Sequence, residues 1–112
     1  MLSAETVFFG ATDGPMTNDQ IFAAPGPIIH LPTVLGGVVP IYNVPEVSAE
    51  LRFPGRVLAD IFLGKITKWN DPAIKAVNPG VNLPNTDITV VHRSEGSGTS
   101  YIWCDYLSKV FS

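Results

Sequence analysis

The chain has 112 residues, of which 46% are hydrophobic and 15% are charged, and its formal net charge is -3. This length allows one compact unit with a core but is too short for a two-lobed protein that closes around a ligand, and the composition argues against disorder. The charge excludes a basic field for a nucleic-acid backbone, so a bound anion needs a local, shaped site.

The single cysteine, Cys104, excludes an internal disulfide. We expect it and the two tryptophans, Trp69 and Trp103, to pack in the core. No Cys/His pairing has the spacing of a zinc site, so we expect no metal and no cofactor. The first residues have neither the basic start nor the apolar run of a signal peptide, and no stretch has the length of a membrane span. The sequence therefore predicts a soluble chain without an export signal.

The first part of the chain is predicted to form a strand, a loop and a short helix. Residues 6–10 are β-branched and aromatic, which favours a buried strand that leads into the loop carrying Asp13. Thr17 is followed three residues later by Gln20, the pattern of a capping box. A short helix is therefore expected from Asn18 to about Ala24.

Three more extended segments are predicted. Residues 28–34 and 38–44 are rich in β-branched residues, and their prolines indicate bends or edge positions. Residues 88–92 form the third segment, directly before the last helix. Together with the helices, these segments predict a mixed α/β fold.

Three helices are predicted in the second half. Apolar residues recur at helical spacing over residues 55–62, and Gly64 stands where a C-terminal cap is expected. Residues 70–72, Asn-Asp-Pro, supply an N-cap candidate and a first-turn proline for the next helix, which ends at residues 78–80. Residues 97–110 carry an apolar stripe and predict the last helix.

Residues 92–100, His-Arg-Ser-Glu-Gly-Ser-Gly-Thr-Ser, join the last strand to the last helix and concentrate hydrogen-bond donors there. A helix N-terminus presents unpaired backbone N–H groups, and glycines let a ligand approach them closely. Ser97 and Thr99 add hydroxyl groups. Arg93 adds a charged fork that suits two oxygens of a tetrahedral oxyanion and that Glu95 can position. The segment therefore predicts an anion site.

A carboxylate in such a site selects for a protonated anion. Asp13 or Glu95 would repel a fully ionised ligand, whereas phosphate near neutral pH carries a proton that a carboxylate can accept. Sulfate carries none and would leave a buried acceptor unpaired. Phosphate is therefore the preferred ligand, and a receptor for another tetrahedral oxyanion such as sulfate is the alternative of the same class.

Simpler interpretations of the same residues stay open. Ser-Gly-Thr before a helix is commonly only an N-cap, and Asp13 in Thr-Asp-Gly-Pro suits a turn. The loop has no lysine for a P-loop, and Ser97 lacks the flanking glycines of a nucleophile elbow, so no enzymatic activity is predicted. His30 and His92 are assigned no role.

Four segments carry a resemblance to a known family: FGATDGPM at 9–16, PTVLGGVV at 32–39, LADIFLGKITKWNDPAI at 58–74 and VVHRSEGSGTS at 90–100. With these segments, the chain resembles the phosphate-binding proteins of ABC-type phosphate uptake systems, the PstS-like proteins, over nearly its whole length. The resemblance implies part of a periplasmic binding protein fold, type II-like, with a mixed sheet flanked by helices and incomplete lobes.

The resemblance also implies the roles of individual residues. Asp13 would accept the phosphate proton, and four residues of the later loop would donate hydrogen bonds to the phosphate oxygens. Glu95 would be the carboxylate that pairs with the arginine, at a place where many family members have aspartate. The phosphate-binding residues implied in this way are Asp13, Arg93, Ser97, Gly98 and Thr99.

Because family members are considerably longer, the resemblance implies a fragment in two parts. Residues 1–27 would be the end of the first lobe, with the Asp13 loop, and residues 28–112 a partial second lobe, with the anion loop. The family works in the periplasm or outside the cell and delivers phosphate to a membrane permease. The alternative is a structural or interaction module that pairs with a second copy or a complementing chain and no longer binds phosphate tightly.

Overall fold

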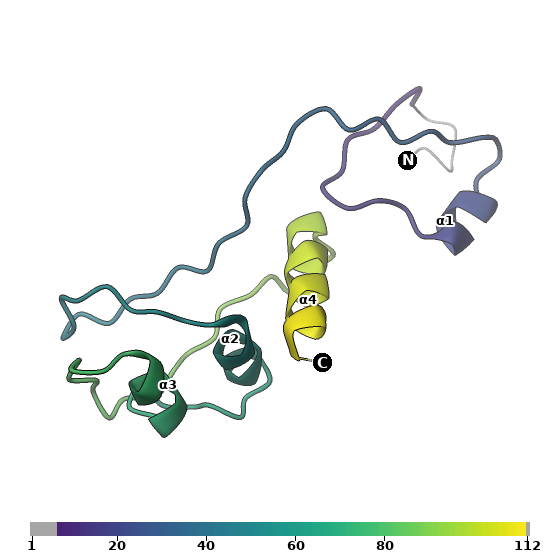
Figure 1. Cartoon of the computed structure of the whole chain (residues 1–112). Helices are drawn as coiled ribbons and strands as arrows, with labels where there is room; N and C mark the ends of the chain where they lie inside the picture. Colours follow the sequence, from purple (N-terminus) through teal and green to yellow (C-terminus); the bar gives the residue numbers. More distant parts are fainter. Residues whose placement is uncertain (1–6, 112) are drawn as a thin grey trace.

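The computed structural model describes residues 7–111, and within them four helices are joined by extended segments (Figure 1). All four helices lie where the sequence predicts them. The buried strand expected over residues 6–10 is wrong where it can be checked: residue 6 lies outside the described residues, and residues 7–10 form no strand and are exposed. The helices are α1 (Asn18–Phe22), α2 (Gly55–Phe62), α3 (Pro72–Val77) and α4 (Gly98–Phe111).

The expected capping signals set the ends of these helices. At α1, Gln20 N donates to Thr17 Oγ1 (3.3 Å) and Thr17 N donates to Gln20 Oε1 (2.9 Å), which completes the capping box. At α3, Asp71 Oδ1 accepts a hydrogen bond from Ala73 N (2.8 Å). Gly64 follows α2 with a φ of 72°, a left-handed conformation that glycine adopts without steric cost.

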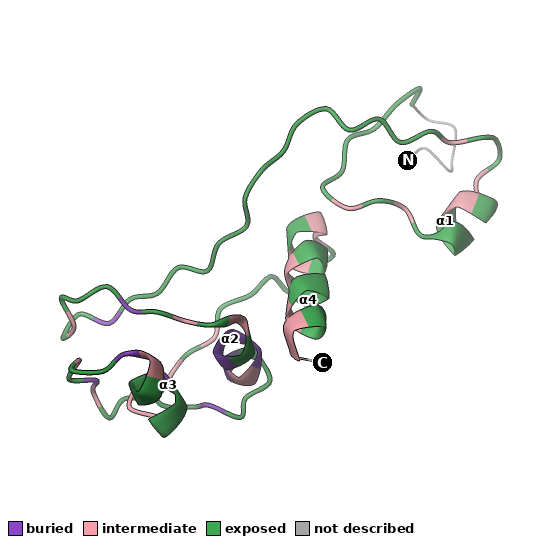
Figure 2. Cartoon of the chain, in the orientation of Figure 1, coloured by how far each residue is buried: buried purple, intermediate pink, exposed green. Residues whose placement is uncertain are grey.

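The hydrophobic core lies around α2 and α3, where the buried residues of Figure 2 gather. Ile74 of α3 is fully enclosed in it. Trp69 packs partly buried against this cluster, as predicted. The core residues are Val44, Leu51, Val57, Ile61, Ile66, Ile74 and Leu83.

The buried Asn78 side chain joins the end of α3 to the segment before α2. Its Oδ1 accepts from Arg52 N (2.7 Å), and its Nδ2 donates to the carbonyl oxygens of Arg52 and Ile74 (both 3.0 Å). A buried amide costs free energy unless its donors and acceptor are paired, and here each of them has a partner. Asn78 therefore links two segments that are distant in sequence.

The predicted mixed sheet is not found within residues 7–111. The strand pairing present there is a single antiparallel bridge between Lys68 and Asp87. Residues 28–34 and 38–44 run as extended coil, and residues 88–92 form no strand either. β-branched residues favour an extended backbone, but a strand also needs a neighbour to complete its hydrogen bonds. Residues 28–34 and 38–44 have no such neighbour in the described structure, and residues 88–92 have one only at their start, where Ile88 N donates to Thr67 O (2.8 Å).

α4 packs against α2 through its C-terminal half. Gly55 permits the close approach, because a Cβ there would lie 2.8 Å from Tyr106 Oη and 3.0 Å from Val110. The Phe62 and Trp103 rings add an edge-to-face contact, with centroids 5.4 Å apart. The expected burial of Cys104 is wrong: Cys104 is exposed, because one step along a helix turns it about 100° from Trp103.

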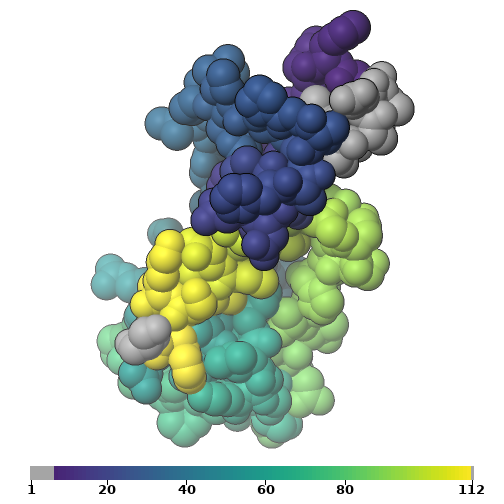
Figure 3. Space-filling model, turned by 90° about the vertical axis from the view of Figure 1, so that its right-hand side faces the viewer, coloured from purple at the N-terminus to yellow at the C-terminus, as the bar shows by residue number. Residues whose placement is uncertain are grey.

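The first turn of α4 lies beside the Asp13 loop, before the residues that pack against α2. Gly14 comes close to Gly98 and Tyr101. In Figure 3 the N-terminal residues, in purple and blue, form the upper end of the molecule, and the core residues, in teal, form the lower end beside α4, in yellow. Within residues 7–111, no helix is long and apolar enough to span a membrane. The fold thus places α4 between the core and the Asp13 loop.

Candidate functional site

Ser97 caps α4, at the end of the predicted anion loop. Its Oγ accepts from Ser100 N (3.3 Å), and its carbonyl oxygen accepts from Tyr101 N (3.0 Å). The first N–H groups of a helix have no intrahelical partner, and they carry part of the positive end of the helix dipole. In α4 these first residues are Gly98 and Thr99. The simpler N-cap interpretation of Ser97 is thus confirmed, and it coexists with an N-terminus able to bind an anion.

Asp13 lies against this helix start, although it is far away in sequence. Thr99 Oγ1 donates a hydrogen bond to Asp13 Oδ2 (3.3 Å). A Cβ on Gly98 would lie 3.0 Å from Asp13 Cβ and 3.0 Å from Gly14 N. Such distances are tighter than most Cβ contacts in proteins, so glycine at position 98 lets the two segments approach without a shift of the backbone. The fold therefore brings together Asp13, Gly98 and Thr99.

The Asp13 loop has a turn of its own. Gly14 N lies 3.2 Å from Thr12 Oγ1 and donates to it, and Thr12 Oγ1 in turn donates to Gly14 O (3.0 Å). Threonine hydroxyls stabilise tight turns in this manner. Asp13 is thus a turn residue, as the simpler interpretation expects, and its carboxylate projects to α4.

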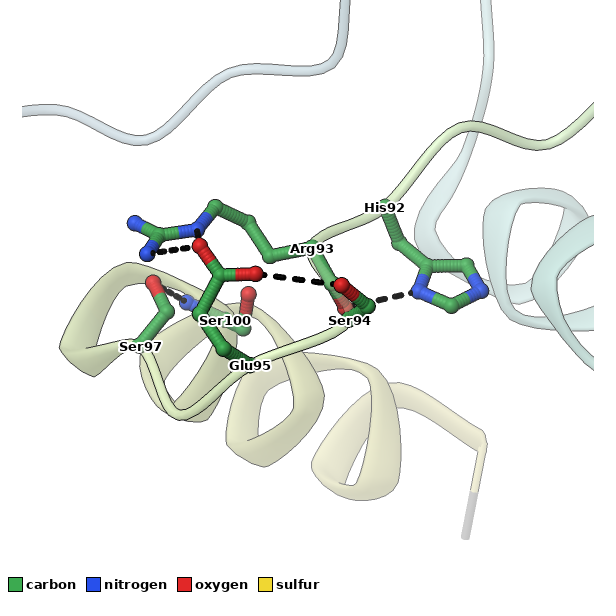
Figure 4. A network of polar contacts seen from close by, with 6 residues as sticks. All are labelled: His92, Arg93, Ser94, Glu95, Ser97 and Ser100. Carbon is green, nitrogen blue, oxygen red and sulfur yellow. Dashed lines mark hydrogen bonds and ion pairs between the residues drawn. The ribbon is translucent and has the colours of Figure 1, made fainter.

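Arg93 is held by Glu95, as Figure 4 shows. Arg93 Nε and Nη2 both donate to Glu95 Oε1, at 3.0 and 2.6 Å. Ser94 Oγ donates to the other oxygen, Glu95 Oε2, at 3.1 Å. The terminal end of the guanidinium points away from Glu95, so N–H groups on Nη1 and Nη2 stay available for an anion.

The Glu95 carboxylate stays charged near neutral pH. The Arg93 hydrogen bond, its own backbone N–H and the Ser94 hydroxyl lower its pKa below the ordinary value. A lowered pKa means that the pair stabilises the fold above the usual glutamate range and loses this effect as pH falls through the lowered value. Near neutral pH, Glu95 therefore keeps Arg93 oriented.

The loop lies on an open surface. The side chains of Arg93 and Glu95 are 56% and 65% exposed, and no hydrogen bond or ion pair joins Arg93 to Asp13 within residues 7–111. Two hollows on this described surface are lined by other residues, one beside Trp103 and one beside residues 24–29. The structure thus forms two neighbouring half-sites, Asp13 with the helix start and Arg93 with Glu95.

Two contacts near the site have no signal in the sequence. Ser94 Oγ donates to Glu95, and His30 Nε2 accepts a hydrogen bond from Met16 N (3.2 Å). Serine and histidine occur at many positions without such roles, so only the spatial arrangement reveals them. The described part of the chain contains no cluster of side chains suited to a metal ion.

This arrangement is suited to binding an oxyanion. Backbone N–H groups at a helix N-terminus, hydroxyl groups and an oriented guanidinium all donate, while the Asp13 carboxylate only accepts. An anion that brings one proton can satisfy donors and acceptor together.

Comparisons with known proteins agree on one family. A family model described as a PBP superfamily domain matches residues 1–111. The chain is 54% identical to the phosphate-binding protein PstS of Pasteurella multocida over 108 residues, which are 96% of this chain and 31% of the relative.

Two further relatives show how widely the similarity extends. The chain is 48% identical to the phosphate-binding protein PstS of Haemophilus influenzae over 96% of its own length and 32% of the relative's. It is 41% identical to the protein of the same name from Methanocaldococcus jannaschii, over 90% of its own length and 28% of the relative's. The chain thus spans about a third of the length of the curated relatives that it matches.

Proposed function

Since this chain belongs to the PBP superfamily, whose family model covers residues 1–111, we propose that it binds inorganic phosphate as part of the solute-binding component of an ABC-type phosphate uptake system. The relatives named phosphate-binding protein PstS support this ligand. In this proposal, residues 1–27 and 28–112 belong to two lobes, the site is periplasmic or extracellular, and a membrane permease receives the phosphate.

The contact between Asp13 and the start of α4 is the observation that carries the proposal. An aspartate at a helix N-terminus accepts hydrogen bonds and would oppose an anion that carries only acceptors. Near neutral pH, phosphate supplies both oxygens for the helix N–H groups and a proton for Asp13. Sulfate would leave Asp13 facing an unprotonated oxygen, and the two ligands would therefore bind with different affinities.

The five proposed phosphate-binding residues then have different roles. Gly98 and Thr99 donate from the helix start, Ser97 sets where that start lies, and Asp13 accepts the ligand proton. Arg93 donates hydrogen bonds to the ligand from the end of its guanidinium that does not contact Glu95, while Glu95 accepts from Nε and Nη2. No step requires bond breaking in the ligand, which fits a receptor rather than an enzyme.

Calorimetric titration near neutral pH with phosphate and then with sulfate tests this function. We expect phosphate to bind, sulfate to bind at least about tenfold more weakly, and Arg93→Ala to weaken phosphate binding by about tenfold or more. Lys68→Ala is the matched control, because Lys68 forms a surface ion pair with Asp87 away from the loop. Equal binding of both anions, or binding unchanged in Arg93→Ala, would contradict the proposal.

A second candidate function, association with another copy of this chain, is favoured by the exposure of residues 29–41. Apolar side chains in this extended segment lie open to solvent, and unpaired extended backbone can pair with another chain. The exposed apolar residues include Ile29, Leu31, Val34, Leu35, Val39 and Ile41. A mass by light scattering that doubles with concentration supports this function, and a monomer at all concentrations contradicts it.

A further inference from the structure

His30 makes a contact with the loop that carries Asp13. Met16 N donates to His30 Nε2 at 3.2 Å, across fourteen positions of sequence. An imidazole nitrogen accepts a hydrogen bond only when it carries no proton. The contact therefore requires that Nε2 of His30 carries no proton and that the ring proton lies on Nδ1.

The Met16 amide is well placed to hold the loop. Pro15 has no backbone N–H, so Met16 provides the first such donor after Gly14. The next donor, Thr17 N, is already used by the capping box of α1. His30 thus gives a partner to the donor that lies between the Asp13 turn and α1.

The opposite side of the loop rests on α4. Gly14 lies close to Gly98 and Tyr101, and Asp13 accepts from Thr99. Without the His30 contact, the segment between Gly14 and Thr17 would lose a hydrogen bond to residues outside the loop and α4. The loop would then gain freedom next to the residue proposed to accept the phosphate proton.

We propose that His30 is a positioning residue that keeps the Asp13 loop in place against α4. The proposal rests on the phosphate-binding function proposed above, because Asp13 is the group through which His30 acts. His30 itself does not touch the ligand in this account. A net contribution typical of one hydrogen bond corresponds to about a two- to tenfold change in affinity.

Three variants, together with one background variant, distinguish the positioning of the Asp13 loop by His30 from a general loss of stability. His30→Ala removes the acceptor, whereas His30→Gln keeps a side-chain oxygen that can accept from the same amide without titrating. Leu31→Ala is the matched control, because Leu31 is the next residue and its side chain is 79% exposed. Asp13→Ala provides the background in which His30 should no longer matter.

Two measurements follow, one of them independent of any ligand. Nitrogen-15 NMR should show the Nδ1–H tautomer of His30, and hydrogen exchange at the Met16 amide should be slowed in the wild-type chain, in His30→Gln and in Leu31→Ala, and fast in His30→Ala. Calorimetry should show phosphate affinity about two- to tenfold weaker in His30→Ala alone, and no further loss when His30→Ala is added to Asp13→Ala.

Several results would overturn the inference. Met16 exchange in His30→Ala that matches Leu31→Ala would mean that the contact does not hold the loop. Equal behaviour of His30→Gln and His30→Ala would mean that the acceptor is not the relevant feature. If no variant binds phosphate but Met16 protection is lost only in His30→Ala, the proposed function fails while the positioning of the loop by His30 is supported.

Discussion

Gly98 is the residue at which the two distant parts of the candidate site meet. A Cβ at this position would lie 3.0 Å from both Asp13 Cβ and Gly14 N. Two of the atoms that it would meet, Gly14 N and Asp13 C, belong to the backbone, so no flexible side chain can move aside. A Cβ at this position would therefore require the backbone of the Asp13 loop to shift by a few tenths of an ångström relative to α4.

Gly98→Ala should weaken phosphate binding by about tenfold or more, because small displacements of binding groups have large effects on affinity. Gly96→Ala is the matched control, since a Cβ on Gly96 would have no atom within 4 Å. Calorimetry measures both variants, and amide shifts of Gly14 report the loop position. Equal affinities in the two variants would contradict the role of close approach.

The length of the side chain at position 95 decides how the carboxylate contacts the Arg93 guanidinium. Glu95 Oε1 receives both Arg93 Nε and Nη2, and Ser94 occupies Oε2. The resemblance noted in the sequence implies that many family members have aspartate here. The longer glutamate side chain still reaches the side edge of the guanidinium and leaves its terminal end for a ligand.

At the scale of elements, Asn78 links α3 to the segment before α2. Its amide makes three hydrogen bonds in a buried setting, to Arg52 N, Arg52 O and Ile74 O. Loss of this side chain would leave buried backbone groups without partners, and each such group costs about 1–3 kcal/mol. The free energy of unfolding therefore depends on this residue.

Asn78→Ala should lower the free energy of unfolding by about 2–4 kcal/mol, from unpaired backbone groups and a small cavity. Asn82→Ala is the control, because Asn82 is exposed and should change stability by less than about 0.5 kcal/mol. Urea denaturation followed by tryptophan fluorescence compares the two. Similar midpoints for both variants would show that the Asn78 bonds contribute little.

The helices could be predicted from the sequence because their signals are local. Thr17 with Gln20, Asp71 before Pro72, and Gly64 each act within one turn of the helix that they limit. The strands could not be predicted in the same way. Residues 28–34 have the right composition, but pairing depends on a neighbour that local sequence does not supply.

The candidate site was predictable in part for the same reason. The donors at Arg93 and residues 97–99 lie on one local segment that leads into a helix, so their pattern indicates an anion site. The approach of Asp13 to Thr99 spans most of the chain, and only the resemblance to a family placed Asp13 with the loop. The His30 contact to Met16 carries no signal in composition or spacing.

At the scale of the whole molecule, the described chain is elongated, with extents of 57 × 26 × 22 Å and a radius of gyration of 18.9 Å. A compact domain of this length would have a radius of gyration of about 13 Å. The buried core occupies residues 44–83, while the Asp13 loop and residues 28–41 are mainly exposed (Figure 2). The candidate site thus lies between the packed core and the exposed N-terminal segments.

Because the core is packed and the Asp13 loop is exposed, bound phosphate should change the structure mainly at the Asp13 loop and the start of α4. The α4 helix contacts the core through its C-terminal half and the Asp13 loop through its start. A ligand that joins Asp13, Arg93 and the start of α4 would order the exposed N-terminal segments without changing the core. Its effects should therefore stay close to the helix start.

A phosphate titration followed by amide and arginine side-chain NMR tests this central claim most directly. We predict shift changes concentrated at Gly14, at the Arg93 guanidinium and at Gly98 to Ser100, with Ile74 in the core unchanged and with much smaller changes from sulfate. Changes centred on the hollow beside Trp103, or the same pattern from both anions, would contradict it.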